Sequence, residues 1–200
     1  MSATERQPLI AGHPALDFTN SVGWHAGAEQ VEQFHAYEDL LAWAGDAEVL
    51  PPAQLARLSH RAAASARAGN VALRRAIEIR ELIYRIFTAV AKGAAPVPSD
   101  LERLRAEQVR ALEHAEPTWS GGLGYSFADS ADLLAPVYPV VLAAMDLLRS
   151  PDLERVRQCA NDPCGWLFVD RSRNRSRRWC SSGDCGNETR VRRFRERQRG

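Results

Sequence analysis

The sequence predicts a mostly α-helical N-terminal domain, residues 1–150, followed by a small four-cysteine domain, residues 151–200. Three observations support this division. Apolar residues recur at helical spacing in the first part, all four cysteines lie in the second part, and the two parts carry opposite net charges. A chain of 200 residues is long enough for one full hydrophobic core and a small annex.

About five helices are expected in residues 1–150, because Gly and Pro residues interrupt the helical pattern at intervals. The longest is expected over residues 71–92, with Asn70 as its N-cap and Gly93 just beyond its end. Its apolar residues form one stripe on a single face: Ile79, Leu82, Ile83, Ile86, Phe87 and Val90. The predicted breaks lie at Gly45, Pro51-Pro52, Gly69-Asn70, residues 93–98 and residues 117–124.

The helix after these residues is expected to begin with a capping box over residues 99–102, Ser-Asp-Leu-Glu. Four apolar residues follow at roughly helical spacing: Leu101, Leu104, Val109 and Leu112.

A small β-hairpin is expected in residues 118–127, where Gly121-Gly122 is a turn signal. This glycine pair lacks the Lys-Ser/Thr of a phosphate-binding loop, which argues against a nucleotide site. The apolar stretch 133–148 contains Pro136, Pro139 and Asp146. We therefore expect a helix that begins after Pro139 or bends there, and no membrane span.

The cysteines form two pairs, Cys159-x4-Cys164 and Cys180-x4-Cys185. Two short loops of this kind let four thiolates converge on one tetrahedral zinc ion. The alternatives are two disulfides or four unrelated buried thiols. Disulfides require an oxidising compartment, and the N-terminus shows no secretory signal, so we expect a cytoplasmic protein with a zinc site.

A zinc ion with four Cys ligands has a closed coordination shell, which is typical of structural sites. All five histidines precede residue 150, so none lies beside the cysteines as a general base. No hydrolase or paired-carboxylate motif stands out elsewhere. We therefore expect a protein that is not an enzyme.

The C-terminal part is strongly basic. Residues 151–200 hold 13 Arg and 7 acidic residues, a net of +6, whereas residues 1–150 carry a net of −5. An arginine-rich surface built into a zinc module favours nucleic-acid binding, because guanidinium groups clamp phosphate and recognise guanine edges. Phosphate contacts serve DNA and RNA alike, and duplex DNA is the partner that we expect. The alternatives are an RNA-binding module or a protein–protein adaptor. The candidate contact residues are Arg171, Arg173, Arg175, Arg177, Arg178, Arg190, Arg193 and Arg197.

The local pattern around the cysteines predicts a treble clef, in the order zinc knuckle, β-hairpin and helix. Residues 165–170 are expected to form a strand, and residues 177–179 are expected to return as its partner around a basic loop. A helix is expected over residues 186–198, with Val191 and Phe194 seated on the module.

The run GWLFVDRSRNRSRRW between Cys164 and Cys180, followed by Cys185-Gly186-Asn187, resembles the CGNR zinc finger. The run HPALDFTNS, residues 13–21, is similar to the start of the ABATE domain that precedes this finger in its family. The resemblance spans nearly the whole chain and implies a bacterial, stress-related transcription regulator with a DNA-binding treble clef. One departure is that Glu188 follows Asn187 where the family has Arg, and Arg190 comes three residues after Asn187.

Three polar residues of the first part are expected to form one buried cluster. Asp17 and Asn20 lie among apolar neighbours, and Arg80 lies at the edge of the long helix's apolar stripe. The favoured interpretation is a structural Asp–Arg ion pair with Asn20 as a cap, because buried charges are usually paired. The alternative is a pocket for a small-molecule or protein effector. The oligomeric state does not follow from the sequence.

Overall fold

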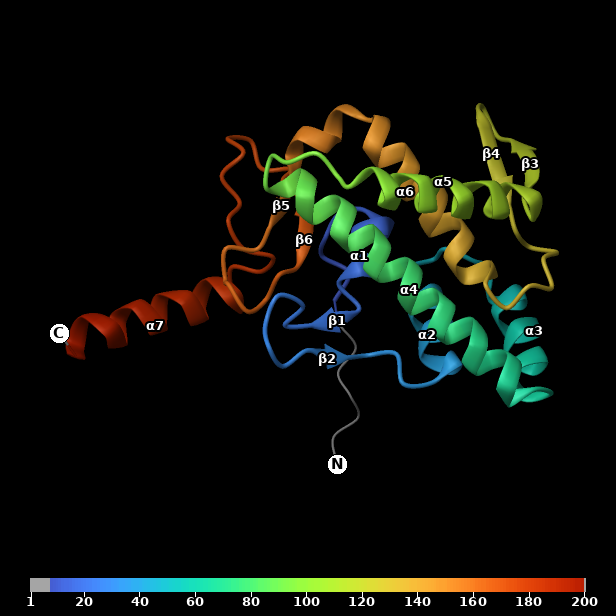
Figure 1. Cartoon of the computed structure of the whole chain (residues 1–200), viewed down its shortest axis with the longest axis horizontal. Coiled ribbons are helices and arrows are strands. Elements are labelled where there is room, and N and C mark those ends of the chain that lie inside the picture. Colours follow the sequence, from blue (N-terminus) through green and yellow to red (C-terminus); the bar gives the residue numbers. More distant parts are fainter. Residues whose placement is uncertain (1–7, 200) are drawn as a thin grey trace.

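The computed structural model describes residues 8–199, which form a helical body with the C-terminal helix projecting from it (Figure 1). The helices are α1 (Pro14–Thr19), α2 (Tyr37–Asp46), α3 (Pro52–Ala63), α4 (Ala66–Ala91), α5 (Pro98–Glu113), α6 (Tyr138–Arg149) and α7 (Cys185–Arg199). Two 3₁₀ helices, η1 (Ala135–Val137) and η2 (Pro151–Arg155), flank α6. The strands form three antiparallel pairs: β1 (Val22–Gly23) with β2 (Val31–Glu32), β3 (Glu116–Trp119) with β4 (Leu123–Ser126), and β5 (Val156–Gln158) with β6 (Leu167–Val169).

Helix α4 is the central element, since it contacts α1, α2, α3, α5 and the β5–β6 pair. Its predicted apolar stripe is confirmed: Ile79, Leu82, Ile83, Ile86 and Phe87 are buried, and Val90 packs against them. Gly93 follows the helix with φ +72°, as expected for a residue just past a helix end.

The predicted start of α4 at Asn70 is wrong. The helix begins at Ala66, because the Ser65 hydroxyl caps it by accepting a hydrogen bond from the Ala68 amide at 3.3 Å. The predicted break at Gly69-Asn70 therefore lies inside the first turns of the helix.

The predicted capping box of α5 is also wrong. The helix begins at Pro98 with Val97 as its N-cap, and Asp100 instead accepts two hydrogen bonds from the Arg85 guanidinium on α4, at 2.9 and 2.7 Å. Of the four apolar residues at helical spacing, Leu104 is buried. The buried face continues through Glu107 and Ala111, and the other three are exposed: Leu101, Val109 and Leu112.

The predicted β-hairpin is confirmed as β3–β4, with Gly121 at φ +81° in its turn. Helix α6 begins at Tyr138 and holds Pro139 in its first turn, where a missing N–H is tolerated. Within residues 8–199, no helix is both long and apolar enough to cross a bilayer.

The β5–β6 pair packs onto the N-terminal part through backbone groups as well as side chains. Strand β6 donates a hydrogen bond from the Val169 amide to the Ala11 carbonyl at 2.8 Å. The Trp166 indole donates to the Val22 carbonyl at 2.8 Å, and the His25 amide donates to the Cys164 carbonyl at 2.8 Å. The predicted boundary at residue 150 falls at the end of α6, and separate folding of the two parts stays a prediction.

Asn20 is the most specific of these links. Its side-chain amide donates to the Leu167 carbonyl at 2.9 Å, and its side-chain oxygen accepts from the Leu167 amide at 2.9 Å. Both residues are buried. The Asn20 side chain therefore supplies partners for the Leu167 N–H and C=O, which would otherwise stay unpaired inside the protein.

We expect Asn20→Ala to lower the free energy of unfolding by about 2–4 kcal/mol, because it leaves a buried N–H and a buried C=O of Leu167 without partners. Chemical denaturation of the zinc-loaded protein measures this loss. Asn174→Ala is the matched control, since Asn174 is exposed. Equal stability of the two variants would contradict the role of Asn20.

Candidate metal centre

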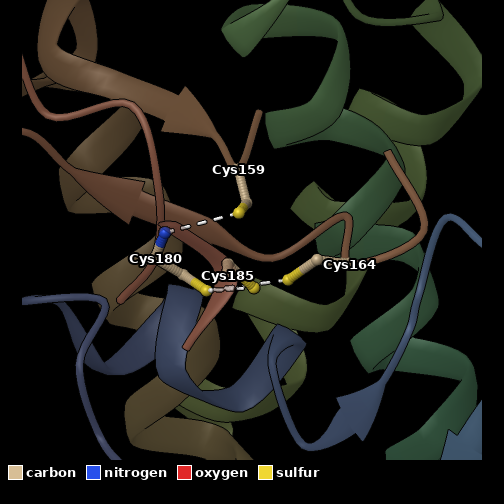
Figure 2. A group of neighbouring side chains, drawn as sticks. All are labelled: Cys159, Cys164, Cys180 and Cys185. Atoms are coloured by element: carbon tan, nitrogen blue, oxygen red, sulfur yellow. Dashed lines mark hydrogen bonds between the residues drawn. The ribbon is translucent and has the colours of Figure 1, made fainter. Parts of the chain in front are cut away.

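The four cysteines converge on one point, as Figure 2 shows. Their Sγ atoms all lie within 4.8 Å of one another, with 3.6 Å between Cys164 and Cys180 and 3.5 Å between Cys180 and Cys185. A tetrahedron with 2.3 Å metal–sulfur bonds has edges of about 3.8 Å, so the arrangement fits a zinc ion. The sulfurs are too far apart for disulfides, and all four cysteines are free and only 4–6% exposed.

Each ligand comes from a different local structure. Cys159 follows β5, Cys164 precedes β6, Cys180 follows the arginine-rich residues 171–178, and Cys185 is the first residue of α7. The Cys180 amide also donates to the Cys159 sulfur at 3.4 Å, a contact typical of sulfurs that carry negative charge.

The electrostatics of the four thiols favour a bound cation. Contact with the Cys159 thiol, together with burial, raises the pKa of Cys164 and Cys180, whereas contact with the other three thiols lowers the pKa of Cys159. Four thiolates this close repel one another unless a divalent ion neutralises them. All four sulfurs serve as ligands in such a site, which leaves no coordination position for substrate.

The loop between Cys159 and Cys164 depends on a glycine and a buried amide. Gly165 has φ +69°, and a Cβ there would lie 2.6 Å from the Ala26 amide nitrogen and 2.7 Å from the Tyr84 hydroxyl. Asn161 is fully buried and donates to the Glu188 carboxylate at 2.9 Å. This bond ties the first cysteine loop to the start of α7.

The start of α7 packs closely on the second cysteine loop. The Trp179 ring covers Gly186, where a Cβ would lie 3.3 Å from the ring. The Thr189 hydroxyl donates to the Cys185 carbonyl at 2.8 Å and is buried. The metal centre and these contacts together fix the direction in which α7 leaves the body.

The fold and the site define a four-cysteine zinc protein with a helical N-terminal part. Comparison with family models matches residues 12–151 to ABATE, described as "Putative stress-induced transcription regulator", and residues 155–198 to the CGNR zinc finger. The chain therefore belongs to the ABATE family and carries a CGNR zinc finger at its C-terminal end. A search of the curated proteins found no match. The predicted zinc cofactor and its four ligands agree with the finger.

The predicted hairpin partner needs correction. Strand β6 pairs with β5, which precedes the first cysteine, and residues 177–179 do not return as a strand. The reason is Asp170, whose buried carboxylate accepts hydrogen bonds from the Ser172 amide at 2.9 Å and the Arg177 amide at 3.1 Å. These bonds fold residues 171–177 into a compact turn.

Val191 and Phe194 were expected to seat α7 on the module, and this expectation is wrong. They are 40% and 57% exposed. The contacts that hold α7 come from its first turn, through Gly186 and Thr189, because the rest of the helix projects away from the body (Figure 1).

The departure from the family motif at Glu188 has a structural counterpart. Glu188 holds Asn161, as described above, so the residue after Asn187 serves the interior of the module. Arg190 directs its guanidinium back to the Ser182 carbonyl at 3.2 Å. Arg190 thus bridges α7 and the second cysteine loop.

Arg177 is placed differently from the other candidate arginines. Its guanidinium donates to the carbonyls of Ile10 at 2.9 Å, Trp179 at 3.2 Å and Cys180 at 2.6 Å. It also lies 4.2 Å from the centre of the Phe168 ring. Three carbonyl acceptors and an aromatic ring make Arg177 a structural residue of the metal centre.

The other described arginines of residues 171–178 and of α7 lie at the surface. Arg171 pairs with Asp152 at 3.3 Å, and Arg175 pairs with Glu154 at 3.7 Å. The side chains of Arg193 and Arg199 lie outside the described residues. Among the described arginines of residues 171–178 and α7, six are exposed and form no ion pair: Arg173, Arg178, Arg190, Arg192, Arg195 and Arg197.

The predicted cluster of Asp17, Asn20 and Arg80 is not formed. Asp17 accepts a hydrogen bond from the Ala11 amide at 2.9 Å, and burial raises the pKa of this carboxyl to about 6. Asn20 binds Leu167. The expected Asp17–Arg80 ion pair is absent from residues 8–199, and each of the three side chains has a structural partner of its own.

Arg80 forms its own buried cluster. Its guanidinium binds both carboxylate oxygens of Glu32, at 2.7 and 2.6 Å, and one oxygen of Glu81 at 2.9 Å. Glu81 also binds His25 at 2.8 Å, and the His25 ring stacks on Tyr84. The bidentate pairing lowers the pKa of Glu32 against the opposing effect of burial.

We expect Arg177→Ala to destabilise the zinc-loaded protein by about 2–4 kcal/mol and to speed zinc release to a chelator, because three carbonyls lose their donor. Its neighbour Arg178 is exposed and contacts only the Trp179 ring, at 5.4 Å from its centre. Arg178→Ala is therefore the matched control and should keep both properties. Equal zinc retention in the two variants would show that Arg177 has no structural role.

Proposed function

We propose that the protein is a transcription regulator that binds duplex DNA through α7 and the basic loop, residues 171–178. The observation that carries this proposal is the placement of α7: beyond its first turn the helix projects from the body (Figure 1), and its described side chains from Arg190 onward are exposed. A helical segment that the protein covers on no side needs a solvated or partnered role. The stress-related role in the family description is part of the proposal.

The dimensions of α7 support insertion into a major groove. The helix has 15 residues, which gives a length of about 22 Å. The groove is about 12 Å wide and admits one α-helix. Because the metal centre fixes the first turn of α7, the protein presents the helix at a defined angle.

The charge of the two segments supports phosphate contact. Besides Arg177, which is bound to backbone carbonyls, the basic loop holds four arginines, and α7 holds six against Glu188 and Glu196. One carboxylate oxygen of Glu188 is already bonded to Asn161. Guanidinium groups bind phosphate oxygens and guanine edges in a bidentate way, which suits recognition of DNA.

The exposed apolar residues on α7 favour a second candidate, a protein–protein adaptor. Val191 and Phe194 lie on the outer part of the helix and would form an apolar anchor for a protein partner. On DNA the same side chains would meet thymine methyl groups. Binding to RNA is a third possibility that the same arginine contacts would serve.

In this proposal the N-terminal part senses an effector and has no catalytic role, and the protein acts in the cytoplasm. Support comes from the packing of the β5–β6 pair on α1 and α4, which places the zinc finger against the helices that an effector would move.

We expect Arg195→Ala with Arg197→Ala to weaken DNA binding and to lower the slope of log K against log salt by about two, because two phosphate contacts are lost. Zinc content should stay unchanged, since neither side chain contacts the metal centre. A salt series with matched duplex DNA and structured RNA measures both affinity and slope.

The control variant is Arg74→Ala with Arg105→Ala, which removes two exposed arginines from α4 and α5. It should keep wild-type affinity. Equal losses of affinity in both variants would show that binding depends on overall charge and not on α7. If the wild-type protein binds neither nucleic acid at low salt, the protein–protein adaptor is the remaining function.

A further inference from the structure

An open cleft lies at the end of α4 opposite the metal centre. Its volume is about 890 Å³. The walls are the end of α3, the first turns of α4, the end of α5 and residues 131–134. None of these segments was predicted to form a site.

The cleft is lined by two kinds of residue. The apolar lining residues, called the floor below, are Ala68, Val71 and Ala72 of α4 and Leu133 and Leu134. The basic lining residues, called the rim below, are Arg61, Arg67, Arg75, Arg110 and His114. Four guanidinium groups therefore line the same cleft as an apolar surface.

The protein neutralises this rim only in part. Arg75 pairs with Glu78 and Glu107, and Arg110 lies 3.9 Å from Glu107. Arg61 and Arg67 are exposed and make no ion pair with any residue from 8 to 199. These two guanidinium groups are the ones available to a ligand.

Asp132 is the one carboxylate among the residues that line the cleft, and it is already bound. It accepts from the Tyr138 hydroxyl at 2.6 Å and the Leu134 amide at 2.9 Å, and it lies 3.4 Å from His114. The first turn of α4 adds the positive end of a 26-residue helix at the same wall. The cleft as a whole attracts anions.

We propose that this cleft binds a small organic anion, a carboxylate with an aliphatic or aromatic body. The carboxylate would pair with Arg61 and Arg67, and the apolar body would cover the floor. An inorganic anion would leave the floor exposed, and a neutral molecule would leave the guanidinium groups unpaired. A volume of about 890 Å³ is within the range of small-molecule sites.

Helix α4 connects the cleft to the metal centre. Its Tyr84 hydroxyl donates to the Gly165 carbonyl at 3.1 Å, directly after the ligand Cys164, and accepts from Gln158 at 3.0 Å. A ligand at the first turns of α4 would thus act on the helix that supports the zinc finger. This regulatory consequence rests on the proposed function, whereas ligand binding itself does not.

The test uses the full-length, zinc-loaded protein and three probes in titration calorimetry: octanoate, octanol and inorganic phosphate. We expect octanoate to bind at least tenfold more tightly than octanol or phosphate. It alone has both a carboxylate for the arginines of the rim and an apolar chain for the floor. Phosphate binding as tight as octanoate, octanol binding as tight as octanoate, or no octanoate binding would each overturn the proposal.

Variants locate the site. Arg61→Ala with Arg67→Ala should weaken octanoate binding roughly tenfold or more, since two charge-assisted contacts are lost. Ala68→Trp, which fills the cleft without changing charge, should weaken it as well. The control, Arg74→Ala with Arg105→Ala, should bind octanoate like the wild type, since these residues do not line the cleft. Octanoate binding that survives both cleft variants would overturn the assignment.

The DNA experiment is independent of this one. If the protein binds octanoate but no DNA, the ligand site is supported and the regulator proposal is contradicted. If it binds DNA but no octanoate, the regulator proposal is supported and the ligand site is contradicted.

Discussion

The convergence of four cysteine sulfurs on one zinc ion is the constraint on which the C-terminal part depends. Residues 159–185 contain one short strand and two loops, and their apolar side chains are too few to order both loops. The metal takes the role of a hydrophobic core here, because it joins four segments that have few apolar contacts with one another. Its ligands follow β5, precede β6, follow the basic loop and begin α7. The orientation of α7 follows from this one centre.

The zinc finger and the N-terminal part satisfy each other's backbone hydrogen bonds. Asn20 supplies both backbone partners of Leu167, and the Ala11 carbonyl pairs with strand β6. In return, Arg177 binds the Ile10 carbonyl and stacks on Phe168. The zinc finger is thus embedded in the helical body, and the residues around its metal centre are bonded directly to the segments that flank α1.

The zinc ligands and the stripe of α4 could be predicted because each depends on residue type and spacing alone. The partners of Asp17 and Arg80 could not, since burial predicts only that a charge is paired, and Glu32 lies 48 positions from Arg80. Arg177 was predicted as a surface residue because nothing in a run of arginines tells which one faces inward. Gly165, next to Cys164, is a residue type that signals a tight turn in the first cysteine loop.

Hydrogen exchange of the full-length protein, with zinc bound and after chelation, tests the central claim most directly. If the metal centre supports the body as well as the finger, loss of zinc will raise exchange in α1 and in the second half of α4, while α3 and the β3–β4 hairpin stay protected. Exchange that rises only in residues 155–199 would contradict the account, because the finger would then be an independent domain on an intact helical body.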